Sequence, residues 1–207
     1  MKTLWQTFIT IVVLSLTAET AVAAKITATA TGSLTLPTAT FPEAVTNGDF
    51  LIRGNSIATT VGNIADEFTT WNFDFTPDPD FSTFSTVGGL KSALLTMTLT
   101  TCCSIQTDRV RIQGLPIIVT DDIQGLPRNV TETIKIDLLD FYSSDNILNT
   151  LNSGNIGEIP MLYSDDAIVS FAELELTSTS TPEPSTLLGL GTLALAGGTL
   201  LRRKRKA

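Results

Sequence analysis

The feature that most limits what this chain can fold into is a strict alternation of apolar and threonine side chains within residues 92–101. The two kinds of residue follow one another singly: Leu95, Thr96, Met97, Thr98, Leu99 and Thr100. Successive side chains of a β-strand point to opposite faces, so a period of two buries one face and exposes the other. The stretch therefore predicts a strand of an antiparallel sheet that has one solvated face.

The same alternation recurs along the chain in shorter stretches. It predicts further strands over residues 25–36, 50–52, 68–75, 131–139 and 167–177. In the strand predicted over 68–75, Trp71, Phe73 and Phe75 share one face. In the last strand one face is predicted to hold every second residue: Ile168, Ser170, Ala172, Leu174 and Leu176.

Helix and turn signals are few. The only helix predicted spans residues 145–151, with Ser144 or Asp145 as its N-cap and Gly154 at its end. Residues 47–49, Asn-Gly-Asp, predict a turn, and residues 76–89 predict a long connection. Many short strands, one helix and Gly/Pro punctuation predict an all-β fold, an antiparallel β-sandwich of jelly-roll type, over residues 24–176. Residues 177–181, which contain only Thr and Ser, predict a polar linker.

A short internal echo lies between two of the predicted strands. Residues 112–116, Ile-Gln-Gly-Leu-Pro, return as residues 123–127. Two copies are too few for a solenoid, which needs three or more units. Duplication and coincidence are both compatible with this pattern.

The N-terminus has the three parts of a secretory signal peptide. Lys2 supplies the positive charge, residues 8–16 form a short apolar segment, and Ala21 and Ala23 flank Val22 as a small-residue cleavage site. We expect the signal peptide to span residues 1–23, with cleavage after Ala23 or Ala24. The alternative, an uncleaved anchor, would have only nine residues in its apolar segment, which are too few to span a bilayer.

The C-terminus reads as a membrane segment that ends in charge. Residues 186–201 carry no ionisable side chain, and at about 1.5 Å per residue they form a helix of roughly 24 Å. Snorkelling of basic side chains and local thinning can cover the shortfall against a core of about 30 Å. The basic residues that follow favour the cytoplasmic side. They are Arg202, Arg203, Lys204, Arg205 and Lys206. A buried helix with a basic surface tail is the alternative interpretation.

This tail resembles the PEP-CTERM sorting signal of exported bacterial proteins, because Pro182, Glu183 and Pro184 precede the apolar span and the basic cluster. The same segment is also called an ice-binding protein C-terminal domain, a name that implies no ice binding. The resemblance implies that a membrane-embedded exosortase recognises the tripeptide, cuts near it and transfers the body to the cell surface or extracellular matrix. It covers residues 182–207 and implies nothing about the body.

Removing both ends changes the charge of what is left. The whole chain has a formal charge of −8, but residues 24–181 hold seven Lys/Arg and nineteen Asp/Glu, a charge of −12. A domain this acidic is repelled by phosphate backbones, so we expect no nucleic-acid partner. The 158 residues of this body suffice for one domain with a substantial core.

The residue types present restrict the chemistry. The chain has no histidine, which excludes Ser-His-Asp and Cys-His nucleophiles and removes the commonest metal ligand. Its two cysteines, Cys102 and Cys103, are adjacent, so they cannot form an ordinary disulfide with each other. A strained vicinal disulfide, an intermolecular bond and two reduced thiols are the alternatives. We expect these cysteines to be structural, with no catalytic residue and no cofactor in the body.

Carboxylates are the acid–base groups that remain. Asp74, Asp78 and Asp80 cluster on one predicted loop and are candidates for calcium, although no EF-hand pattern is present. Two aspartate pairs, 121–122 and 165–166, lie at the ends of predicted strands, but adjacent aspartates more often solvate a turn than catalyse. No metal site is therefore predicted beyond the calcium candidates.

These observations predict an exported, surface-sorted protein whose body is a structural or carbohydrate-binding β-sandwich. Its expected partners are an exosortase, the membrane before processing, and polysaccharide. Trp71, Tyr142 and Tyr163 would stack on sugars if they were exposed. The alternative is a secreted carbohydrate-active hydrolase that uses Asp or Glu carboxylates.

Overall fold

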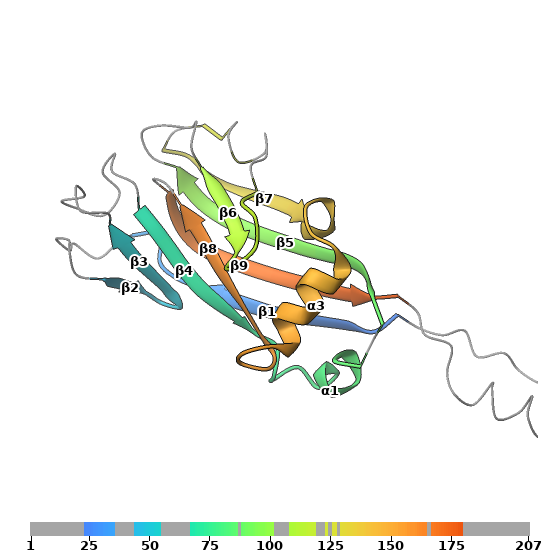
Figure 1. The fold of residues 1–207 in the computed structure, drawn as a ribbon. Coiled ribbons are helices and arrows are strands. Elements are labelled where there is room, and N and C mark those ends of the chain that lie inside the picture. The colour runs from blue at the N-terminus through green and yellow to red at the C-terminus, as the bar shows by residue number, and fades with distance from the viewer. Residues whose placement is uncertain are drawn as a thin grey trace, which may run out of the picture. The chain divides into compact units, whose positions relative to one another are not determined.

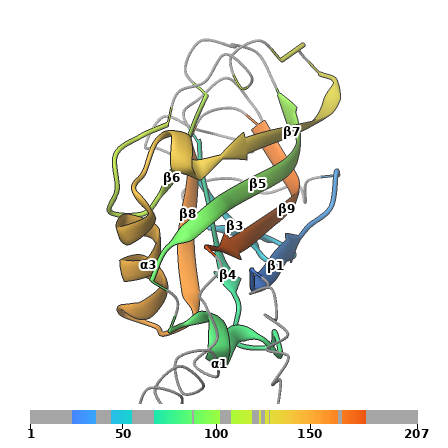
Figure 2. The same cartoon turned by 90° about the vertical axis from the view of Figure 1, so that its right-hand side faces the viewer.

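Two antiparallel sheets make up most of the part of the chain that this computed structural model describes, which is residues 23–35, 44–54, 67–86, 88–101, 108–118, 123, 126–127, 129–164 and 167–179. The four-stranded sheet has the order β1 (Lys25–Thr31), β9 (Ala167–Ser178), β5 (Leu90–Thr101) and β7 (Thr131–Asp137). The five-stranded sheet has the order β2 (Val45–Asn47), β3 (Phe50–Gly54), β4 (Glu67–Asp74), β8 (Glu158–Ser164) and β6 (Arg109–Ile112). Figure 1 labels the strands, and Figure 2 shows the two sheets as separate layers.

The apolar faces of both sheets meet in one hydrophobic core. On β5 the alternation predicted from the sequence is confirmed, because Leu95, Met97 and Leu99 are fully buried while the threonines between them are partly exposed. On β4 the same holds for Trp71 and Phe73, and Phe75 continues the buried row just beyond the strand. Trp71 makes edge-to-face contacts with two phenylalanines, with ring centroids 5.5 Å apart for Phe50 and 6.0 Å apart for Phe73. Period-two patterning therefore fixes which face of each strand is buried.

The strands pair in a nested order along the chain. The first strand, β1, pairs with the last, β9; inside that pair β4 pairs with β8, then β5 with β7, and innermost Val110 of β6 bridges to Ile118. Each of these pairings is antiparallel, and the hairpin of β2 and β3 extends the five-stranded sheet beyond β4. The outermost pair consequently holds the two ends of the described body together (Figure 1).

Three strands escape prediction from the sequence. β2 and β6 have three and four residues, too few to show a period. β8 contains Pro160, which argues against a strand, and yet Ile159, Met161 and Tyr163 alternate inward on it. The strand tolerates the proline because β6 reaches only to the partner of Met161, so that Pro160 faces Gln113, just beyond β6.

The helices also differ from the prediction. Within the predicted connection 76–89, residues Phe81–Phe84 form a one-turn helix, α1, so the predicted helix is not the only one. The predicted helix is α3 (Ser144–Asn152), and its N-cap is Ser143, not Ser144 or Asp145. Ser144 has another role, because its hydroxyl accepts a hydrogen bond from the Leu90 N–H at 2.7 Å. A 3-10 turn, η1 (Leu138–Asp140), replaces the predicted end of the strand that is now β7.

A β-bulge changes which residues of β9 point into the core. The register with β5 shifts between Thr98, which pairs with Phe171, and Leu99, which pairs with Val169. Val169 and Ser170 are consequently both buried, and the inward row continues at Ala167 rather than at the predicted Ile168. At its other end β9 extends through Ser178, two residues into the segment predicted to be a linker.

Candidate functional site

An open groove lined by both polar and apolar groups crosses the outer face of the five-stranded sheet. It has two adjoining halves of about 420 and 450 Å³, which share Asn72 and Gln113. The half next to α3, called the helix-side half, is also lined by Gly114, Leu115, Thr150, Ser153, Gly154, Asn155, Glu158 and Pro160. The half next to β1, called the edge-side half, is also lined by Thr29, Asp49, Leu51, Thr70, Trp71 and Asp74.

Two side-chain amides flank Pro160 where the halves meet. Asn72 of β4 is the register partner of Pro160 of β8, and on the other side of β8 the Gln113 N–H donates to the Pro160 carbonyl at 2.8 Å. The Gln113 side chain donates from Nε2 to the Met161 carbonyl at 3.0 Å. Both amide residues are exposed, while Ile159 and Met161 point into the core. The sheet therefore presents an apolar ring between two amides.

The Glu158 carboxylate binds two other residues that line the helix-side half. Glu158 Oε2 accepts from Asn72 Nδ2 and from Asn155 Nδ2, each at 3.1 Å. Asp74 is the register partner of Glu158 on the neighbouring strand, so two carboxylates lie opposite each other on the outer face. Like charges in this position repel, and the two amide donors offset part of that repulsion at Glu158.

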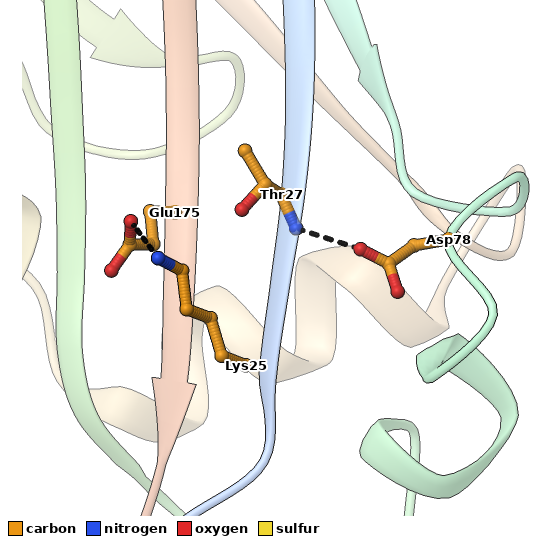
Figure 3. A network of polar contacts seen from close by, with 4 residues as sticks. All are labelled: Lys25, Thr27, Asp78 and Glu175. Atoms are coloured by element: carbon orange, nitrogen blue, oxygen red, sulfur yellow. Dashed lines mark hydrogen bonds and ion pairs between the residues drawn. The ribbon is translucent and has the colours of Figure 1, made fainter.

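The free edge of β1 borders the edge-side half. Thr27 N donates to Asp78 Oδ2 at 3.1 Å, as Figure 3 shows, and Thr31 N donates to Asp49 Oδ2 at 2.7 Å. Alternate residues of an edge strand direct their N–H and C=O groups away from the sheet. Thr29 lies two residues from both Thr27 and Thr31, so its N–H and C=O groups also point away from the sheet, at this end of the groove.

The structure separates the roles of the three calcium candidates. Asp74 Oδ1 accepts from Thr76 N at 2.9 Å and from Thr76 Oγ1 at 2.6 Å, whereas Asp78 binds the Thr27 and Asp80 N–H groups. Asp80 is the N-cap residue of α1, and its carbonyl accepts from Thr83 and Phe84. Among the described residues no group of three metal-ligating side chains is placed to hold an ion. The hydrogen bonds of Asp74 and Asp78 are contacts within a turn and to the edge of β1.

The predicted sugar-stacking aromatics are buried. Trp71 is 3% exposed, Tyr142 is 5% exposed and Tyr163 is fully buried, so none of them offers a ring face to a ligand. Tyr142 instead donates from its hydroxyl to the Pro116 carbonyl at 2.6 Å. Burial raises the pKa of Tyr142 above its ordinary value of 10.0, so the hydroxyl stays a donor to an even higher pH than an exposed tyrosine would. The condition for aromatic stacking at these positions, an exposed ring, is therefore not met.

The two ends of the described body are joined by hydrogen bonds. Ala24 N donates to Ser178 Oγ, and Ser178 N donates to the Ala24 carbonyl, at 2.9 and 2.8 Å. Thr179 N donates to the Gly89 carbonyl at 2.9 Å, and Lys25 pairs with Glu175 at 2.6 Å (Figure 3). The chain therefore enters and leaves the four-stranded sheet at one place.

Several predicted features lie outside the described residues. They are residues 1–22 of the predicted signal peptide, including Ala21 of its cleavage site, the tripeptide Pro182–Pro184, the span 186–201, the basic cluster 202–206, Cys102 and Cys103, and the aspartate pairs 121–122 and 165–166. Among the described helices none is long and apolar enough to cross a membrane.

The groove residues gave little signal in the sequence. The alternation on the strand predicted over 68–75 places Asn72 on the solvent face, away from Trp71 and Phe73. It is the one sequence signal for a groove residue. Gln113 lies in the internal echo and Pro160 in a stretch for which no strand is predicted, so the sequence places neither residue on a sheet. Their meeting with Asn72 follows from sheet register, which the sequence alone does not specify.

Comparison with known proteins identifies the C-terminal segment. The PEP-CTERM protein-sorting motif matches residues 180–206, as the resemblance predicted. Neither the curated proteins nor the solved structures that were compared with this chain gave a match. The motif implies export, exosortase-related processing and sorting to the cell surface through a C-terminal signal.

Proposed function

We propose that this chain is a surface or matrix component whose body is a non-catalytic, carbohydrate-binding β-sandwich. The sorting motif at residues 180–206 supplies the destination. The outer-face groove carries the binding part of the proposal, because it is a large concave surface lined by amides, hydroxyls and carboxylates. Such groups pair with sugar hydroxyls, and envelope polysaccharide surrounds a protein at that destination.

The nested strand order supports a jelly-roll arrangement of that sandwich. A jelly roll is one long antiparallel hairpin rolled up, so its first strand pairs with its last and each inner strand pairs with its counterpart. β1 with β9, β4 with β8, β5 with β7 and Val110 with Ile118 follow this scheme. The β2–β3 hairpin is an addition at one edge.

The proposed route is a membrane-anchored precursor that is released by processing. Residues 186–201 would hold the body outside the inner leaflet until an exosortase cuts beside Pro182–Pro184. The body has a charge of −12, which keeps it soluble after release.

Binding without hydrolysis is the test of the proposed activity. The purified protein is incubated with capsular or matrix polysaccharide from an exporting bacterium, and both retention and newly formed reducing ends are measured. We expect retention without new reducing ends. If none of the polysaccharides retained the protein, the proposal would be contradicted.

A second candidate function rests on Asp74 and Glu158. Two carboxylates opposite each other on a sheet face are the groups that a glycoside hydrolase needs. One oxygen of Glu158 accepts hydrogen bonds from two amides, and one oxygen of Asp74 accepts from Thr76, so each carboxylate has its other oxygen for a substrate. Release of reducing ends that disappears in both Asp74→Asn and Glu158→Gln would establish the hydrolase instead.

A further inference from the structure

We propose that the outer-face groove binds an uncharged polysaccharide, with neighbouring sugar units in its two halves and with Asn72 and Gln113 contacting both units. This inference rests on the proposed carbohydrate binding and goes beyond it by assigning the site and the class of sugar. It follows from the lining groups, the size of the halves and the local charge.

The lining groups suit a ligand that has many hydroxyls. Amide side chains offer both N–H donors and C=O acceptors, so Asn72 and Gln113 can each meet a hydroxyl as donor or acceptor. Pro160 lies between them on the sheet surface. An apolar ring flanked by two amides matches a sugar unit, which has an apolar C–H face and a polar rim.

The size and openness of the groove suit a chain rather than a single small molecule. Each half, at about 420 or 450 Å³, is within the range of about 300–1,000 Å³ that is usual for small-molecule sites. The halves adjoin at two shared residues and open to solvent, so a polymer can enter at one half and leave by the other. The outward peptide group of Thr29 adds a donor and an acceptor at the β1 end.

Charge excludes acidic sugars. Glu158 lines the helix-side half, Asp49 and Asp74 line the edge-side half, and neither half is lined by a described Lys or Arg. A uronate or sulfated unit placed here would meet three carboxylates on a body whose formal charge is −12. The groove should therefore favour neutral chains over acidic ones.

Affinity electrophoresis tests the inference. The full chain, purified in detergent, is run through gels that contain dextran, hydroxyethyl cellulose or galactomannan as neutral probes and polygalacturonate as the acidic probe. We expect retardation by at least one neutral probe and none by polygalacturonate. Asn72→Ala and Gln113→Ala should each weaken Kd about tenfold, the factor that corresponds to ~1.4 kcal/mol.

The control variant is Thr133→Ala. Thr133 is exposed on the four-stranded sheet and bonds Thr98 across the strands at 2.9 Å, much as Asn72 bonds Glu158. It should leave retardation unchanged. Asn72→Asp keeps the shape of the side chain but replaces a donor to Glu158 with a third carboxylate beside Glu158 and Asp74. It should abolish binding and lower Tm through charge repulsion, while the circular dichroism spectrum stays that of the folded body.

The outcomes separate this inference from the proposed function. Retardation by a neutral probe that survives in all three groove variants would overturn the assigned site and leave carbohydrate binding intact. Stronger retardation by polygalacturonate than by every neutral probe would overturn the sugar class. Failure of the wild-type chain to bind any of the four probes would overturn both the inference and the carbohydrate-binding function.

Discussion

Aspartate and asparagine side chains fix the backbone at the strand ends and edges of this protein. Asp49 and Asp78 accept from N–H groups on the free edge of β1, and Asn47 pairs with Ser33 through both its Oδ1 and its Nδ2. Each of these side chains satisfies a backbone group that the sheets leave unpaired. Part of the acidic excess is therefore structural, which composition alone does not reveal.

The turn at Gly48 should tolerate no side chain. Gly48 has φ +61°, and a Cβ at this position would lie 2.1 Å from the Thr31 carbonyl oxygen. We expect Gly48→Ala to destabilise the body by more than the ~1–2 kcal/mol that the left-handed conformation alone costs. Urea unfolding measures this loss. Gly88→Ala, where a Cβ meets nothing within 4 Å, is the control and should change the free energy of unfolding by less than ~0.5 kcal/mol. Equal effects would contradict the assigned turn.

Asp78 should act through Thr27 and not through calcium. Asp78→Ala removes the acceptor for the Thr27 and Asp80 N–H groups, so we expect a loss of about 1.5–3 kcal/mol. Asp78→Asn keeps one acceptor oxygen and should cost less. Thermal melts in millimolar calcium and in chelator should coincide for the wild type. A calcium-dependent rise in Tm that Asp78→Asn removes would instead establish calcium binding at Asp78.

Single elements show where sequence reasoning works and where it fails. Long alternating stretches predicted β1, β4, β5 and β7, because burial of one face dominates their composition. β8 could not be predicted because it contains Pro160, and the fact that β6 ends before it reaches this proline is a feature of the tertiary structure. The bulge in β9 places Ala167 in the core instead of the predicted Ile168. The sequence does not predict this change, because the alternation of residue types does not reveal where the register shifts.

The cap of α3 can be tested directly. Ser143 Oγ accepts from Asn146 N at 3.2 Å and is the side-chain cap of this helix. Ser143→Ala should therefore cost ~0.5–2 kcal/mol of stability in chemical denaturation. Ser153→Ala at the other end of α3, where the hydroxyl only approaches the Thr150 carbonyl at 3.5 Å, should change it by less than ~0.5 kcal/mol. A larger effect at Ser153 would contradict the capping assignment.

At the scale of the whole molecule, the C-terminal sorting motif could be predicted from the sequence, whereas the groove could not. Signal and sorting segments are read from local composition, which needs no fold. The groove needs β4, β8 and the end of β6 in register, so Asn72, Gln113 and Pro160 meet only in the folded body. The nested pairing also means that the first strand, β1, can pair with β9 only after the last strand has been synthesised.

The structure also fixes where processing can leave the body intact. Cleavage after Ala23 preserves both hydrogen bonds between Ala24 and Ser178, whereas cleavage after Ala24 removes them. A cut beside Pro182 leaves the whole of β9, which ends at Ser178. We therefore expect the mature protein to begin at Ala24 and to end near Pro182.

Intact mass spectrometry of protein recovered from the cell surface or matrix tests this account most directly. The account predicts one species that begins at Ala24 and lacks residues 186–207, so that both hydrophobic ends are absent. Material from cells without exosortase should retain the C-terminal segment and stay with the membrane. Surface or matrix protein that still carries the Arg202–Lys206 cluster would contradict sorting by this signal.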